Sequence, residues 1–161
     1  MKLLLRHRLC VLSLVVLASV QASVGAASAN RSRKALSSYG VVPGAISQVV
    51  ILEFPERILT RTGITPERLE RLYQYKLEIR DLPSAIQRDA LLAQLKKTSI
   101  SISGNTPDVR TAVLLYDGAG RRVASMYFAQ GGTRGAINTD AGTIAGGVYA
   151  WAKSMMKGFS N

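Results

Sequence analysis

The predicted fold depends on residues 109–130, which read VRTAVLLY (109–116), DGAG (117–120) and RRVASMYFAQ (121–130). Two runs rich in β-branched and aromatic residues flank a short glycine-rich turn, which is a strong hairpin signal. Asp117 can hydrogen-bond to the backbone of its own turn, and Gly118 and Gly120 can adopt a positive φ without a steric clash. The stretch therefore predicts a central β-hairpin.

A symmetric turn would place Tyr116 opposite Arg121 and Arg110 opposite Tyr127. Because successive side chains of a strand point to opposite faces, the hairpin then has one apolar face and one that mixes arginine with tyrosine. The apolar face predicts a core, whereas arginine and tyrosine are enriched in protein interfaces. The core face carries Val109, Val113, Leu115, Ala124, Met126 and Phe128, and the opposite face carries Arg110, Leu114, Tyr116, Arg121, Val123 and Tyr127.

Further strands are expected on both sides of the hairpin. Residues 46–54 contain a continuous apolar run, typical of a strand buried on both faces, and residues 55–62 fit a short helix. Serine and isoleucine alternate over residues 98–103, which predicts a half-buried strand. After the hairpin, residues 131–135 are glycine-rich and predict a turn, and residues 136–138 fit a short edge strand.

Three longer helices complete the predicted fold. Thr65 precedes a proline and a glutamate, as at a typical helix start, and leucines at helical spacing extend the predicted helix to about residue 80. A second helix over residues 83–97 would form a helical hairpin with the first, and apolar spacing from Ile144 to Met155 predicts a C-terminal helix. We therefore expect an α+β fold, with an antiparallel sheet of about four strands built on the central hairpin, and with the helical hairpin and the C-terminal helix packed on one face.

The N-terminus has the pattern of a secretory signal peptide. Three basic residues precede an apolar run over residues 9–20, and small residues then offer cleavage after Ala22, Ala26 or Ala29. An uncleaved membrane anchor is the alternative, but twelve apolar residues are too short for a hydrocarbon core of about 30 Å. We expect residues 1–29 to be removed, residues 30–44 to form a flexible basic arm, and residues 45–161 to form one domain in the periplasm or outside the cell.

The expected mature chain lacks the residues that most hydrolases use. His7 and Cys10 are the only histidine and cysteine of the chain, and both lie in the predicted signal peptide. The mature chain therefore has no disulfide, no Ser-His-Asp or Cys-His nucleophile and no Cys/His zinc cluster. We expect neither a cofactor nor a metal, and we expect that the protein is not an enzyme.

Carboxylates are the main remaining route to catalysis. A glycosidase places two of them across a cleft at about 5 to 9.5 Å, but most of the ten in this chain lie among arginines on predicted helices or in turns. Glu53 is the exception, because it ends an apolar strand. A carboxylate-dependent hydrolase built on Glu53 is the least favoured of three hypotheses.

The leading hypothesis is a non-enzymatic protein that binds another macromolecule, as an inhibitor, an immunity protein or an assembly accessory protein. The chain has 21 basic and 10 acidic residues, which favours a partner with an acidic surface, such as another envelope or exported protein. The predicted contact residues are Arg110, Tyr116, Arg121 and Tyr127 on the hairpin and Arg134 in the following turn. The alternative hypothesis is a binder of anionic envelope lipid or glycan, whereas export makes nucleic acid the least favoured partner.

Overall fold

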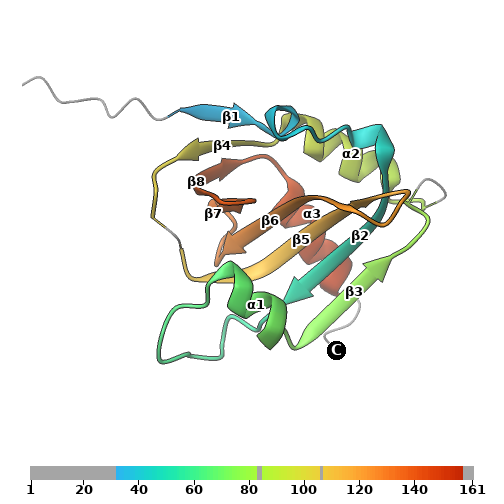
Figure 1. Ribbon diagram of the computed structural model, residues 1–161. Coiled ribbons are helices and arrows are strands. Elements are labelled where there is room, and N and C mark those ends of the chain that lie inside the picture. The colour runs from blue at the N-terminus through green and yellow to red at the C-terminus, as the bar shows by residue number, and fades with distance from the viewer. Residues whose placement is uncertain (1–31, 83–84, 106, 158–161) are drawn as a thin grey trace, which may run out of the picture.

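An eight-stranded antiparallel sheet forms the centre of the structure, a computed structural model that describes residues 32–82, 85–105 and 107–157 (Figure 1). The strand order is β1-β4-β8-β7-β6-β5-β2-β3. The strands are β1 (Arg33–Ala35), β2 (Ile46–Glu53), β3 (Tyr75–Ile79), β4 (Ser99–Ile102), β5 (Val109–Asp117), β6 (Arg122–Ala129), β7 (Arg134–Ile137) and β8 (Asp140–Ala145). The helices are α1 (Pro66–Leu72), α2 (Arg88–Lys97) and α3 (Val148–Met156), with two short 3-10 helices, η1 (Leu36–Tyr39) and η2 (Pro43–Ala45). The predicted signal peptide lies outside the described residues.

The larger apolar core lies on the face of the sheet that packs against η1, α2 and α3. Leu91 and Leu95 of α2 and Trp151 and Ala152 of α3 are buried there against the predicted core face of the hairpin. The hairpin residues in this core are Val113, Leu115, Ala124, Met126 and Phe128, as predicted. The α+β class and the core face of the hairpin are therefore confirmed.

A second apolar cluster lies on the opposite face of the sheet, beneath α1. Leu69 of α1 and Ile64 just before it are fully buried against β2 and β5, together with Phe54. The apolar run of β2 is consequently buried on both faces, as expected. The helices, however, lie on both faces of the sheet and not on one (Figure 1).

The hairpin forms with a register that differs from the symmetric one by two residues. Leu115 faces Ala124 and Tyr116 faces Arg122, because the turn is wide and extends to Arg121, whose carbonyl accepts from the Asp117 N–H. A shift of two residues leaves each side chain on its face, since the side-chain period of a strand is two. Val109 and Val123 are the exceptions, because the register also shifts between Val109 and Thr111 and between Leu115 and Tyr116. Val109 joins the cluster beneath α1, and Val123 packs against the larger core.

The predicted helical hairpin and the four-strand sheet are both wrong. The first helix ends at Leu72, and Tyr75–Ile79 instead forms β3, which pairs with β2. The spacing of the apolar residues in this stretch is compatible with a helix and with a strand. The strand forms because the edge of β2 offers backbone hydrogen-bond partners. The helices on either side of β3 lie on opposite faces of the sheet, and α2 begins at Arg88. No helix forms over residues 55–62.

Two glycine-rich segments form β7 and β8 in the middle of the sheet. Gly135 of β7 faces Gly142 of β8. A Cβ atom on Gly135 would overlap the Tyr127 carbonyl oxygen, and one on Gly142 would overlap the Ser101 carbonyl oxygen. These glycines therefore allow the strands to pack closely. The sequence had predicted a turn at Gly135 and a helix shortly after Gly142. Ile144 accordingly lies in β8.

Part of the expected flexible arm is ordered in the structure. Arg33–Ala35 pairs with β4 as an edge strand, and Leu36 and Val41 are buried in the larger core. None of the helices among the described residues is long and apolar enough to cross a membrane.

Candidate functional site

The face of the sheet that carries α1 has two halves. Figure 1 shows α1 in front of β5 and β2, whereas no helix lies in front of β4, β7 and β8. We call the part of this face beneath α1 and residues 54–64 the covered half. We call the same face of β1, β4, β8 and β7 the open half.

Four side chains form one continuous row across the open half. Arg33 of β1 faces Ser101 of β4, Ser101 faces Thr143 of β8, and Thr143 faces Arg134 of β7. Residues directly opposite each other project from the same face of a sheet. With strands about 4.8 Å apart, the Cα atoms of the two arginines lie about 14 Å apart. We call these four residues the exposed row.

The exposed row is accessible and is surrounded by small side chains. Arg33, Thr143 and Arg134 are exposed, and Ser101 is half-buried. The neighbouring positions on this face are Ala35, Ser99, Ala136, Ala141 and Ala145. Ala35 and Ala145 are exposed, whereas Ser99, Ala136 and Ala141 are buried. The open half therefore presents the exposed row, with an arginine toward either side and small side chains around it.

The arginines of the exposed row have no carboxylate partner among the described residues. The Arg33 Nε donates to the Ser99 Oγ at 3.1 Å, which leaves its other guanidinium donors free. Asp140 begins β8, but its carboxylate binds the Lys34 Nζ at 2.8 Å and the Tyr39 hydroxyl at 2.7 Å. Those two bonds lower the pKa of Asp140, with the Lys34 bond contributing most. The positive charge of the exposed row is thus not neutralised by a paired acid.

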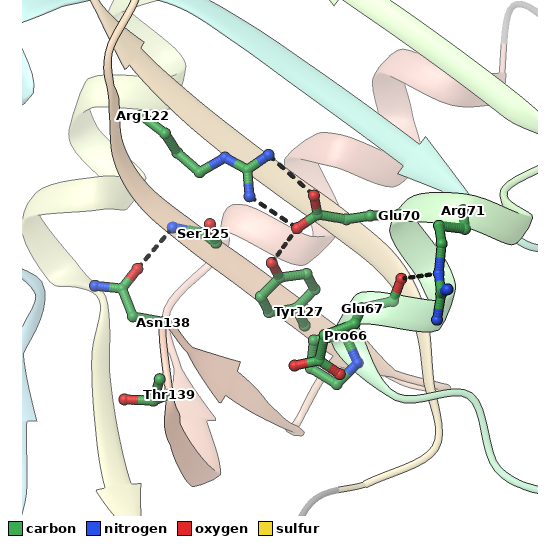
Figure 2. A pocket seen from close by; sticks show the side chains of 9 residues that line it. All are labelled: Pro66, Glu67, Glu70, Arg71, Arg122, Ser125, Tyr127, Asn138 and Thr139. Atoms are coloured by element: carbon green, nitrogen blue, oxygen red, sulfur yellow. Dashed lines mark hydrogen bonds and ion pairs between the residues drawn. The ribbon is translucent and has the colours of Figure 1, made fainter.

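A polar groove of about 600 Å³ lies between α1 and the strands at the border of the two halves (Figure 2). Its walls come from α1, from β6 and from the turn between β7 and β8. The lining residues are Pro66, Glu67, Glu70, Arg71, Arg122, Ser125, Tyr127, Asn138 and Thr139.

A closed cluster of polar groups forms one wall of the groove. Glu70 accepts two hydrogen bonds from the Arg122 guanidinium, each 2.9 Å long, and a third from the Tyr127 hydroxyl. Burial, followed by the bond to Glu70, raises the pKa of Tyr127 to about 12. Arg122 also lies over the Tyr116 ring, 5.8 Å from its centroid. The Glu70 carboxylate is therefore occupied by Arg122 and Tyr127, and the Tyr127 hydroxyl stays protonated near neutral pH.

The opposite rim of the groove keeps polar groups available. Asn138 adopts a φ of +52° in the β7–β8 turn, and its Oδ1 accepts from the Ser125 N–H at 2.9 Å. That bond leaves the Asn138 amide donors exposed next to Thr139. Across the groove, Arg71 is exposed on α1. The rim therefore extends the polar surface of the open half toward α1.

Two of the five predicted contact residues are buried. Arg110 is only 7% exposed, and its guanidinium binds Asp108 at 2.7 Å and the Ile58 carbonyl at 2.8 Å. Tyr127 is 5% exposed and bonds to Glu70. Both lie beneath α1 and the segment before it, which the hairpin sequence does not reveal, so neither side chain is available to a partner.

The other three predicted contact residues differ in what they contact. Tyr116 is half-buried against Arg122, and Arg121 is exposed but closes its own turn by bonding to Asp117 at 2.8 Å. Arg134 is exposed and belongs to the exposed row. The rest of that row was not predicted as a site, because its residues come from three separate strands. The serine–isoleucine alternation did, however, place Ser101 on the face away from the core.

Glu53 lies beside a second carboxylate, but both contact one ammonium group. The Lys153 Nζ binds Glu53 at 2.7 Å and Glu56 at 3.5 Å, in a cavity of about 370 Å³. Partial burial is the largest single effect and lowers the pKa of Lys153, but the bond to Glu53 and the nearby negative charges together outweigh it, so the pKa of Lys153 is raised. The two carboxylates therefore share one ammonium group in this cavity.

No protein-family model, curated protein or solved structure matches the chain. Among the described residues, no group of three or more His, Cys, Asp or Glu side chains is arranged to hold a metal ion. The function must therefore be argued from the open half, the groove and the surface around them.

Proposed function

We propose that this chain is a non-enzymatic protein that binds an acidic surface of another protein through its open half. The observation that carries the proposal is the exposed row, in which two arginines flank Ser101 and Thr143 and have no carboxylate partner in the described part of the chain. Arginine is over-represented at interfaces because its planar guanidinium binds carboxylates in a bidentate manner. The small side chains between the two arginines allow a partner backbone to approach the sheet closely.

The groove rim enlarges this surface without adding reactive groups. Arg71, Asn138 and Thr139 supply further exposed donors next to the open half. Glu70 is bound to Arg122, and Glu53 and Glu56 are bound to Lys153, whereas Glu67 is exposed on the groove wall. A surface with many donors and paired acids is suited to recognition of an acidic partner rather than to catalysis.

Export belongs to the same proposal. If residues 1–29 are a signal peptide, the partner is another envelope or exported protein, and this chain acts on it as an inhibitor, an immunity protein or an assembly accessory protein. The sequence pattern of residues 1–29 supports this compartment.

Site-directed photo-crosslinking tests the proposal in the cells that produce the protein. A photo-reactive residue at Thr143, in the middle of the exposed row, is expected to crosslink to one main protein. The same residue at Ala93, which is exposed on α2 behind the sheet, is the matched control. Equal patterns from the two positions would contradict the proposal.

Charge reversal then tests whether the two arginines hold the partner. Arg33→Glu combined with Arg134→Glu is expected to remove the Thr143 crosslink. Lys96→Glu combined with Lys97→Glu makes the same change in net charge on exposed residues of α2 and is expected to retain it. If both double variants lose the crosslink equally, net charge and not the open half governs binding.

A further inference from the structure

The loop between β2 and α1 presents one apolar side chain surrounded by arginines. Leu59 is 92% exposed, and Arg57 and Arg61 are exposed two residues away on either side. Figure 1 shows this loop projecting from the body of the molecule at the lower left, beside α1. An exposed leucine between two cations at a projecting tip differs from both the open half and the groove.

The position of Leu59 is fixed by the fold. The buried Arg110 donates to the Ile58 carbonyl at 2.8 Å and approaches the Thr60 Oγ1 at 3.5 Å, on either side of Leu59. The Ile58 side chain packs against the apolar cluster beneath α1, whereas Leu59 next to it is exposed. Arg110 is therefore a positioning residue for the tip, held in turn by Asp108.

The far end of the loop is also anchored. The Arg68 Nη1 donates to the Thr62 Oγ1 and to the Gly63 carbonyl, and the Ile64 N–H donates to Asp108 at 2.6 Å. The loop is therefore held on both sides of Leu59, so that residues 57–61, called the tip, have a defined position.

The charges around the tip are predominantly positive. Arg57, Arg61 and Arg71 are exposed and have no salt-bridge partner among the described residues. The nearby acids are mostly occupied: Asp108 binds Arg110, and Glu56 binds the Tyr149 hydroxyl and Lys153. Glu67, exposed on α1, is the remaining carboxylate of this region.

We infer that this loop is a docking point for an anionic lipid surface, with Leu59 entering the boundary of the acyl chains and Arg57 and Arg61 contacting lipid phosphates. Basic residues next to an apolar anchor bind anionic membranes reversibly, because attraction to the headgroups adds to the burial of the apolar group. A protein interface usually centres on a cluster of apolar anchors in a packed patch, whereas this tip offers one side chain. The inference is independent of the open half.

Vesicle co-sedimentation tests the inference on the protein purified in the form that its cells contain. Binding is expected to vesicles of phosphatidylcholine mixed with phosphatidylglycerol, and not to vesicles of phosphatidylcholine alone. Leu59→Asp should lower the partition coefficient about tenfold or more. Arg57→Gln with Arg61→Gln should lower it roughly 25-fold, since each cation near an anionic surface contributes about fivefold.

Ile86 provides a matched control, because it is also 92% exposed but lies in the segment before α2. Ile86→Asp should change the partition coefficient by less than about twofold, as expected for an apolar side chain outside the contact. Equal effects of Leu59→Asp and Ile86→Asp, or equal binding to both kinds of vesicle, would overturn the inference. Absence of vesicle binding, together with a soluble protein captured only when Leu59 is present, would overturn it as well and assign the loop to a protein interface.

Discussion

The two halves of one sheet face are stabilised in different ways. The covered half relies on large side chains and matched charges, with Leu69 and Tyr127 buried and Arg110 paired with Asp108. In the open half the strands are held by close backbone packing. Gly135 lies so near the neighbouring strand that a Cβ atom would overlap the Tyr127 carbonyl oxygen. Arginines therefore differ between the two halves: Arg110 and Arg122 are paired with acids in the covered half, whereas Arg33 and Arg134 of the open half are exposed and have no salt bridge among the described residues.

The largest expected effect concerns the backbone packing of the open half. Gly135→Ala would place a methyl group on the Tyr127 carbonyl oxygen, so β6 and β7 must separate. We expect the free energy of unfolding to fall by about 3 kcal/mol or more, measured by denaturant unfolding. Gly118→Ala, with no atom within 4 Å of the added Cβ, is the control and should leave stability unchanged or raise it by about 0.5 kcal/mol. A tolerated Gly135→Ala would contradict this account of the open half.

The next effect concerns a buried arginine of the covered half. Arg110→Ala leaves the Asp108 carboxylate and the Ile58 carbonyl without their main donor. Because the Asp108 side chain is 45% exposed and can be rehydrated, we expect a loss of about 2–3 kcal/mol rather than more. Arg134→Ala, measured in the same denaturation experiment, should change stability by less than about 0.5 kcal/mol. Equal losses from the two variants would remove the distinction between the halves.

The hairpin was predictable because its signals are local. Its turn residues and alternating runs lie within residues 109–130, and a change of register by two residues does not exchange the faces. The start of α1 was equally local, since the Thr65 hydroxyl accepts from the Arg68 N–H as the N-cap pattern indicates. β3 was missed because its apolar residues fit two periods, and only the presence of β2 beside it decides between them.

The site was predicted only in part, because exposure depends on tertiary structure. Arginine and tyrosine on the second face of the hairpin show the same pattern whether or not a helix covers them. The short α1 covers Arg110 and Tyr127 but not Arg134. Gly135 was assigned to a turn, since a glycine required for strand packing cannot be told from a turn glycine by sequence alone.

A pH dependence is expected from the Tyr127–Glu70 contact of the covered half. Burial and the bond to Glu70 raise the pKa of Tyr127 from its ordinary value near 10 to about 12, so the folded state keeps this proton at a pH where the unfolded chain loses it. The stabilisation is complete below pH 10 and is lost as the pH rises through 12, by roughly 2–3 kcal/mol.

Comparison of the wild type with Tyr127→Phe isolates this dependence. Denaturant unfolding between about pH 9 and pH 11 should show a steeper loss of stability in the wild type, because phenylalanine has no proton to lose. Identical slopes for the two proteins would show that Tyr127 is not held as the structure places it.

The smallest expected effect on stability concerns the residues proposed to bind the partner. Arg33→Glu with Arg134→Glu should change the free energy of unfolding by less than about 0.5 kcal/mol, because both side chains are exposed and neither is in a salt bridge among the described residues. The same double variant should lose the Thr143 crosslink. A stability loss comparable to that of Arg110→Ala would mean that the open half uses its arginines for the fold, as the covered half does. Loss of the crosslink with retained stability would separate binding from folding within one sheet face.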